Sequence, residues 1–177
     1  MTPPREVPDW DSYYLGLAYM FAARSKDPHT QCGAIVVDDH HVPLGFGCNG
    51  APRQMNDKEI DWERPHKYPF MRHAEENAID HSRILTLTFP PNCTMYVTGH
   101  PCSHCMLKIV SKGISRVLYG PNKIACVPKE EEELSQAIAD KGHVIIQSFA
   151  GSLKWLDDRL KSLKETGLLD KYGYGHN

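Results

Sequence analysis

The sequence predicts an α/β fold, a three-layer α/β/α sandwich in which a mixed sheet of about five strands lies between two layers of helices. Stretches with apolar residues at helical spacing alternate along the chain with short apolar runs typical of buried strands. The chain has 177 residues, 41% of them hydrophobic, which suits one domain with a core of its own. We expect a single domain over 1–177 that ends in a helical extension at about 151–177.

The first predicted helix begins at Asp9 or Asp11, either of which can cap it, and runs to about Ser25. Asp27-Pro28 ends it, because the residue before a proline disfavours helix. Its apolar residues recur at helical spacing: Tyr14, Leu17, Ala18 and Phe21.

Two short strands follow, at 34–37 and 43–46, and the polar residues 38–41 between them predict a hairpin. The stretch 45–72 is polar and rich in Pro and Gly. Because loops of that length inside a compact domain usually carry function, we expect this one to do so.

The remaining predicted elements alternate regularly. They are a helix at 73–82, a strand at 95–98, a helix at 102–112 before Gly113, a strand at 117–119, a helix at 129–140, a strand at 144–147 and a helix at 152–164. The last helix carries four leucines on one face, at 153, 156, 160 and 163. The acidic run 130–133 is interpreted as a solvated helix start and not as a metal site.

Charge and composition exclude several classes of protein. Lys and Arg number 20 and Asp and Glu 22, so the net charge of −2 argues against a broad nucleic-acid binder. No apolar run approaches the ~20 residues of a membrane span, and the first residues lack the apolar stretch of a signal peptide. We therefore expect a cytoplasmic protein whose cysteines are thiols or metal ligands. The six are Cys32, Cys48, Cys93, Cys102, Cys105 and Cys126.

Two short motifs carry the chemistry, H-A-E at 73–75 and P-C-S-H-C at 101–105. H-x-E followed by P-C-x-x-C is the signature of zinc deaminases. Two cysteines three positions apart lie on one face of a helical turn, so both sulfurs can reach one ion, and His73 completes the set. Three protein ligands leave a fourth tetrahedral position for water, as in catalytic zinc sites.

Both motifs open predicted helices, where backbone N–H groups lower the pKa of a thiol and withdraw electron density from its sulfur. The ion can then still lower the pKa of a bound water to about 7. Glu75 lies two residues from His73 and need not be a ligand, so it can accept a proton and return it to the substrate.

Other interpretations remain open at this point. A C-x-x-C pair can be a redox pair or half of a structural zinc site, and His100 or His104 could ligate in place of His73. The two motifs together, in this order, favour the catalytic interpretation. The other cysteines are interpreted as small buried hydrophobic residues.

The chain resembles the deoxycytidylate (dCMP) deaminase family from about residue 11 to residue 147. Five stretches carry the resemblance: A-R-S-K-D-P at 23–28, C-G-A-I-V-V at 32–37, G-F-G-C-N-G at 45–50, Y-P-F-M-R-H-A-E-E-N-A-I at 68–79 and M-Y-V-T-G-H-P-C-S-H-C at 95–105. The zinc motifs are shared across the cytidine deaminase-like superfamily, whereas R-S-K-D-P and G-x-N-G are more specific to the deoxycytidylate branch.

The resemblance implies a three-layer fold, hydrolysis of dCMP to dUMP and ammonia, and a homo-oligomer, a hexamer or trimer. It assigns His73, Cys102 and Cys105 to one Zn²⁺ and Glu75 to proton transfer. It matches Asn49 to the asparagine that binds the nucleotide sugar, and it makes the N–H of Ala74 a contact for the base carbonyl.

The phosphate of such a substrate needs cations or helix-start amides. Arg24, Ser25, Lys26 and Lys123 are the candidates, although basic residues at a helix C-terminus are also favourable with no ligand. Four residues of the long loop could form a lid over the nucleotide or an interface: Trp62, His66, Tyr68 and Phe70.

The chain departs from the family in two places. Glu76 stands where many members have Leu, and 52–54 lacks a glycine found in members that bind dCTP or dTTP, with Mg²⁺, as effectors. Alternative substrates are dCTP, methylated dCMP, deoxycytidine and tRNA adenosine, the last disfavoured because Met is missing from the cysteine pair. A non-catalytic zinc-stabilised binding module is the alternative of another class, and the acid at Glu75 argues against it.

Overall fold

The computed structural model describes residues 3–82, 87–121 and 127–167, and its centre is a five-stranded sheet. The strands are β1 (Gly33–Val37), β2 (Pro43–Cys48), β3 (Thr94–Val97), β4 (Arg116–Tyr119) and β5 (Ile145–Ser148), in the order β2-β1-β3-β4-β5. β1 is antiparallel to β2 and β3, whereas β3, β4 and β5 run parallel. The predicted mixed sheet of five strands is confirmed.

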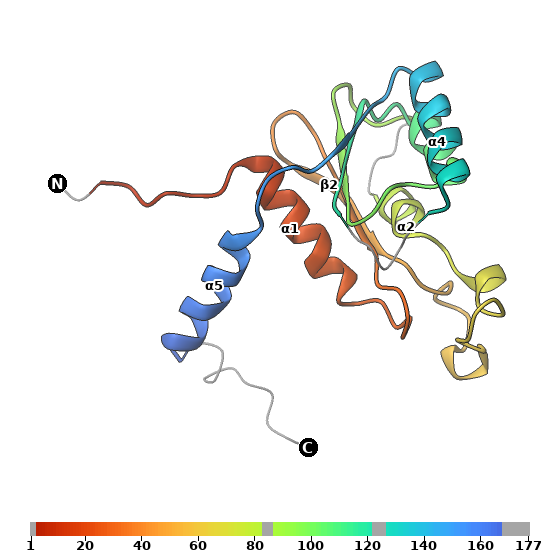
Figure 1. Ribbon diagram of the computed structural model, residues 1–177, viewed down its shortest axis with the longest axis horizontal. Helices are drawn as coiled ribbons and strands as arrows, with labels where there is room; N and C mark the ends of the chain where they lie inside the picture. The colour runs from red at the N-terminus through yellow and green to blue at the C-terminus, as the bar shows by residue number, and fades with distance from the viewer. Residues whose placement is uncertain (1–2, 83–86, 122–126, 168–177) are drawn as a thin grey trace.

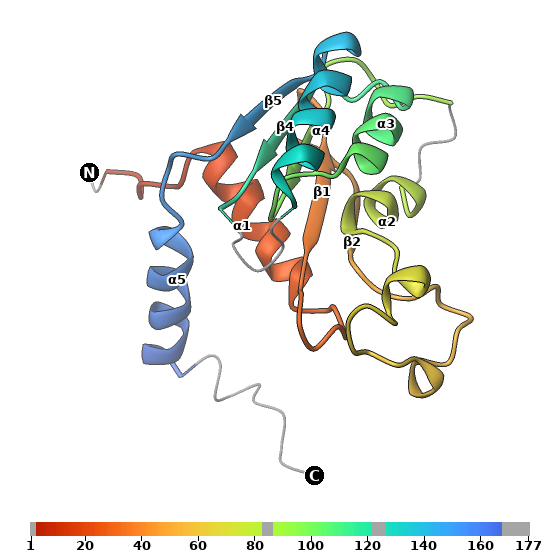
Figure 2. The same cartoon turned by 45° about the vertical axis from the view of Figure 1, so that its right-hand side comes forward.

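Helices cover both faces of the sheet (Figures 1 and 2). They are α1 (Trp10–Ala22), α2 (Ala74–Asp80), α3 (Ser103–Ser111), α4 (Lys129–Lys141) and α5 (Lys154–Glu165). α1 lies on one face, and α2, α3 and α4 lie on the other, which confirms the three-layer architecture. α1 begins as predicted, because the Asp9 carboxylate accepts a hydrogen bond from the Ser12 N–H.

The alternation of side chains along β1 divides the core into two halves. Ala34 and Val36 pack with residues of α2, α3 and α4, whereas Ile35 and Val37 pack with residues of α1. Every residue of β1 is buried, which explains why this strand is a continuous apolar run.

Glycines in β2 allow α2 to lie directly on the sheet. A Cβ atom at Gly45 would come within 2.2 Å of the Ala78 carbonyl oxygen, and one at Gly47 within 2.6 Å of the Ala78 nitrogen. The Asn77 side chain adds a hydrogen bond of 2.8 Å to the Cys48 carbonyl. The sheet therefore fixes the position of α2, the helix that begins after His73.

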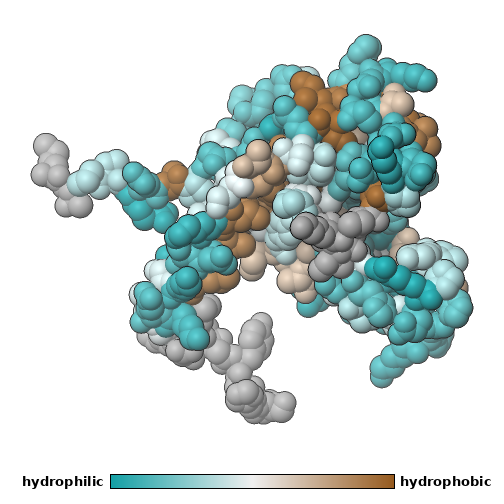
Figure 3. All heavy atoms as spheres, viewed as in Figure 1, coloured by the Kyte–Doolittle hydropathy of each residue, from teal (hydrophilic) through white to brown (hydrophobic). Residues whose placement is uncertain are grey.

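α5 lies beside α1 and away from the sheet (Figure 1), and it covers Lys154–Glu165 of the extension expected at about 151–177, whose residues from 168 on lie outside the described part. The Trp155 ring lies 5.6 Å from the Tyr13 ring, tilted by 34°, and its Nε1–H donates a hydrogen bond of 3.1 Å to the Ser12 carbonyl. Apolar surface gathers in the angle between α1 and α5 in the space-filling view of Figure 3. Among the described residues, no helix is both long and apolar enough to cross a bilayer.

Candidate metal centre

Two helix starts bring three metal-binding side chains together. His73 is the N-cap residue of α2, Cys102 is the N-cap residue of α3, and Cys105 lies in the first turn of α3. The His73 Nδ1 atom is 3.5 Å from the Cys102 sulfur and 3.3 Å from the Cys105 sulfur. All three donor atoms lie within 4.8 Å of one another.

This donor set fits zinc. Bonds of about 2.3 Å to sulfur and about 2.1 Å to nitrogen place N and S about 3.6 Å apart in a tetrahedral site. The distances of 3.3 and 3.5 Å found here are close to that value. Within the described residues the cluster contains no fourth donor, which is the composition of an open zinc site.

Hydrogen bonds among His73, Cys102 and Cys105 shift the pKa of all three groups. Hydrogen bonds from Cys105 and His73 lower the pKa of Cys102 to about 4, which favours its thiolate form. The bond to Cys102 raises the pKa of His73 to about 9, and the bond to Cys102 together with burial raises the pKa of the Cys105 thiol. A cation that binds here displaces these protons, so its affinity rises with pH.

Glu75 lies beside the cluster and is 6% exposed. Burial raises the pKa of its carboxyl group, and the imidazole of His73 partly opposes that shift. A buried acid with a raised pKa, beside the metal donors but outside the donor set, is suited to general acid–base catalysis.

Glu76, the first departure from the family pattern, connects the two helices that hold the donors. Its carboxylate accepts a hydrogen bond of 3.1 Å from the His73 N–H, as in a capping box. It also lies 3.6 Å from His104 and 3.8 Å from Lys108, both on α3. A leucine at this position would lose all these contacts.

The Glu131 carboxylate caps the start of α3, as the Glu76 carboxylate caps the start of α2. Its carboxylate accepts hydrogen bonds from the backbone N–H of Ser103 at 3.1 Å and from its hydroxyl at 3.3 Å. The run 130–133 lies at the exposed start of α4 and outside the donor cluster, as expected, and Glu131 in addition satisfies a free N–H group of the neighbouring helix.

The donors open into a cavity between the two helix starts and the long loop. Its described lining residues are Asp27, Thr30, Cys32, Asn49, Arg64, Lys67, Tyr68, Met71, His73, Ala74, Glu75, Val97, Gly99, His100, Cys102 and Val127. Asn49 is 8% exposed, and its carboxamide accepts from the Cys32 N–H at 2.8 Å and donates to the Thr30 carbonyl at 2.9 Å. One of its N–H groups remains to meet a ligand.

The other two histidines near the cysteines lie outside the donor cluster. His100 lines the cavity, and its Nδ1 atom is 2.8 Å from the Pro101 carbonyl oxygen. His104 is exposed and pairs with Glu76. Of the three candidate histidines, the structure places only His73 within ligand distance of both sulfurs.

Of the basic residues proposed for phosphate binding, Arg24 and Lys26 do not line this cavity. Arg24 and Lys26 line a second cavity, together with Asn49, Arg53 and His81. Lys26 forms an ion pair with Asp57, and the Ser25 hydroxyl accepts from the Asp27 N–H at 3.3 Å. Lys123 and Cys126 lie outside the described residues.

The long loop contributes aromatic residues to both cavities. It leaves β2 at Cys48 and contains two 3₁₀ turns, Asp57–Glu59 and Tyr68–Phe70. Tyr68 lines the first cavity and Trp62 the second, whereas His66 pairs with Asp61 and Phe70 is exposed. Paired backbone hydrogen bonds between Gly50 and Arg72 join the two ends of the loop.

A buried ion pair between Lys67 and Asp27 fixes the long loop to the segment after α1. The Lys67 ammonium lies 2.6 Å from both carboxylate oxygens of Asp27, and the two residues are 1% and 3% exposed. Burial raises the pKa of Asp27, but Lys67 and the N–H groups of His29 and Thr30 outweigh it and lower the pKa. A lysine in a polar loop carries no pattern that predicts burial, so the sequence analysis missed it.

We expect Lys67→Met to lower the free energy of unfolding by about 3–5 kcal/mol, because it leaves the Asp27 carboxylate buried and unpaired. Urea denaturation measures the change. The double variant Asp27→Asn/Lys67→Met removes both charges and should recover part of the loss. Lys58→Met, at an exposed position of the same loop, is the matched control. Equal unfolding curves for wild type and Lys67→Met would contradict the expectation.

Comparison with known proteins identifies relatives that match the part of the chain containing the donor cluster. The family model described as "Cytidine and deoxycytidylate deaminase zinc-binding region" matches residues 8–121. The deoxycytidylate deaminase of Pongo abelii is 32% identical over 147 residues, 80% of each chain. That of Homo sapiens is 36% identical over 121 residues, 65% of this chain and 66% of the relative. The crystal structure of a cyanophage S-TIM5 dCMP deaminase with dCMP and dUMP superposes with a TM-score of 0.65 at 22% identity, covering 82% of this chain and all of that one.

Proposed function

The chain belongs to the cytidine and deoxycytidylate deaminase family, and from that premise we propose that it is a zinc-dependent hydrolase that converts dCMP and water to dUMP and ammonia. The observation that carries the proposal is the arrangement of His73, Cys102 and Cys105 as an open three-donor site beside the buried carboxyl of Glu75. A purely structural zinc site has no need of a non-ligating acid.

The residues of the site divide the work between binding and proton transfer. When bound to His73, Cys102 and Cys105, Zn²⁺ supplies Lewis-acid chemistry that makes water nucleophilic at neutral pH. Glu75 accepts the proton that this water loses as it attacks C4 of the cytosine ring. It delivers that proton to N3, then accepts the remaining proton of the oxygen now bound to C4 and delivers it to the departing amino group, so that ammonia leaves and a carbonyl remains at C4.

Two further residues orient the nucleotide. The Ala74 N–H lies at the start of α2 and lines the cavity, where it can donate to the carbonyl oxygen of the base. The remaining N–H of the Asn49 carboxamide can donate to a sugar hydroxyl. Asn49 is already held by two hydrogen bonds, which makes it a preorganised contact.

The experiment that tests the proposal is an ammonia-release assay on the zinc-loaded protein. It compares dCMP with deoxycytidine, dCTP, methylated dCMP and a tRNA. We expect dCMP to give the largest kcat/KM. No ammonia from dCMP would reject the proposal, and a larger kcat/KM for another substrate would assign the chain to that substrate.

We propose in addition that the protein is a homo-oligomer, a hexamer or trimer. We further propose that the second cavity binds a dCTP or dTTP effector with Mg²⁺. The cavity offers Arg24, Arg53 and His81 to a triphosphate, whereas Lys26 in its lining is paired with Asp57. Sedimentation measures the mass, and the dCMP assay repeated with each triphosphate measures regulation. A monomer would contradict the proposed oligomer. Rates unchanged by both triphosphates would contradict the proposed effector site.

A further inference from the structure

Two side chains with permanent positive charge, Arg64 and Lys67, line the cavity beside the donor cluster among the described residues. Lys67 is 1% exposed and is paired with both oxygens of Asp27, so it cannot reach an anion in the cavity. Arg64 is exposed and forms no ion pair with a described carboxylate. Among the residues that the structure describes, its guanidinium is therefore the cation available to an anion at this site.

The guanidinium of Arg64 is also held in place. Its Nη2 atom donates a hydrogen bond of 2.5 Å to the Thr30 hydroxyl, and the Thr30 carbonyl accepts one of 2.9 Å from Asn49. Among the described residues, one of the five guanidinium N–H groups is used in this way, which leaves the others for a ligand. Arginine binds phosphate oxygens through paired N–H groups, so this leaves a bidentate contact intact.

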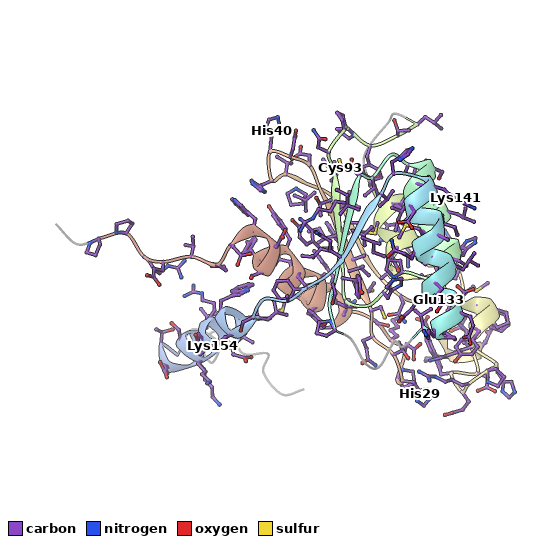
Figure 4. The ribbon with its side chains drawn as sticks, turned by 45° about the horizontal axis from the view of Figure 1, so that its top comes forward. His29, His40, Cys93, Glu133, Lys141 and Lys154 are labelled. Atoms are coloured by element: carbon purple, nitrogen blue, oxygen red, sulfur yellow. The ribbon has the colours of Figure 1, made fainter. Side chains whose placement is uncertain are left out.

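The cavity has a buried end and an exposed end. Its floor is formed by Glu75 and Ala74, which are 6% and 0% exposed, and its rim by exposed residues such as Arg64 and Tyr68. A phosphate dianion is costly to bury, so a nucleotide that places its base on the floor places its phosphate at the rim. The rim lies where the long loop meets the segment after α1: His29, labelled in Figure 4, is 3.4 Å from Glu63 of that loop.

We infer that Arg64, steadied by Thr30, binds the 5′-phosphate of the substrate and makes the enzyme prefer a nucleotide to a nucleoside. This inference rests on the proposed function, since it names the group that selects dCMP at the same site. It replaces Arg24 and Lys26 as phosphate ligands of the substrate, because both line the second cavity and Lys26 is paired with Asp57.

The test compares Arg64→Gln with wild type on dCMP and on deoxycytidine, which lacks the phosphate. Loss of a charge-assisted contact predicts a fall of about 10- to 100-fold in kcat/KM for dCMP, with the value for deoxycytidine unchanged. The control is Arg159→Gln, which removes an exposed arginine of α5. It should leave both values as in wild type.

Binding of dUMP, followed by calorimetry, separates this inference from the proposed function. Weaker binding of dUMP to Arg64→Gln supports the phosphate contact even if wild type releases no ammonia from dCMP, a result that would reject the proposed function alone. Equal dUMP affinities of wild type and Arg64→Gln overturn the inference. A parallel loss of activity on dCMP and deoxycytidine also overturns it, because the phosphate would then not be the group recognised.

Discussion

The Glu75→Gln variant is expected to bind zinc as wild type does and to lose about 10²- to 10⁴-fold in kcat, the range that general acid–base catalysis supplies. Glutamine has nearly the same shape but neither accepts nor returns a proton at neutral pH. The carboxyl is buried beside the donors and is not one of them, so its loss should leave the metal in place. Ammonia release measures kcat, and elemental analysis measures zinc.

The matched control is Glu133→Gln on the exposed face of α4, labelled in Figure 4. Both variants remove one carboxylate. Glu133, however, is exposed to solvent, pairs with Lys129 one turn away and lies outside the site. A near-normal kcat for Glu75→Gln would show that another group carries the proton. Loss of zinc from that variant would show that the carboxylate belongs to the ligand set.

The Cys105→Ala variant is expected to lose both zinc and turnover. Zinc sites of four ligands contribute about 10–16 kcal/mol, so one ligand is worth about 3–4 kcal/mol, or roughly 100- to 1,000-fold in affinity. Cys105 is 0% exposed, and its sulfur lies 3.3 Å from the His73 nitrogen, so no solvent ligand can easily replace it. Zinc competition with a chelator measures the affinity.

Cys93→Ala provides the control, because Cys93 is also 0% exposed but packs in the core away from the donors. It is marked in Figure 4. We expect it to cost about 1 kcal/mol of stability, as small core truncations do, and to keep zinc and turnover. If Cys105→Ala held zinc as tightly as Cys93→Ala, the three-donor assignment would be wrong.

The donor cluster could be predicted from the sequence because its geometry is mostly local. Cys102 and Cys105 are three residues apart on one helix, and the motif at 73–75 opens another helix. Both helices lie on one face of the sheet, so alternation of helices and strands was enough to bring them together.

The rim of the cavity could not be predicted in the same way. Arg24 and Lys26 follow α1, and which cavity they face depends on where the chain turns after Ala22. The burial of Lys67 and the position of Arg64 depend on the path of the long loop, which Asp27 fixes from a distance of 40 residues along the chain. Contacts of this kind leave no periodic pattern in a sequence.

The backbone bridge between Gly50 and Arg72 determines which part of the chain can tolerate changes in length. The chain leaves and re-enters the framework at one point, directly before His73, so the exposed parts of the loop between the two ends can change in length without moving the helix that begins after His73. Within the loop, the buried pair of Lys67 and Asp27 sets the limit, because an altered loop has to keep that pair or remove both of its charges.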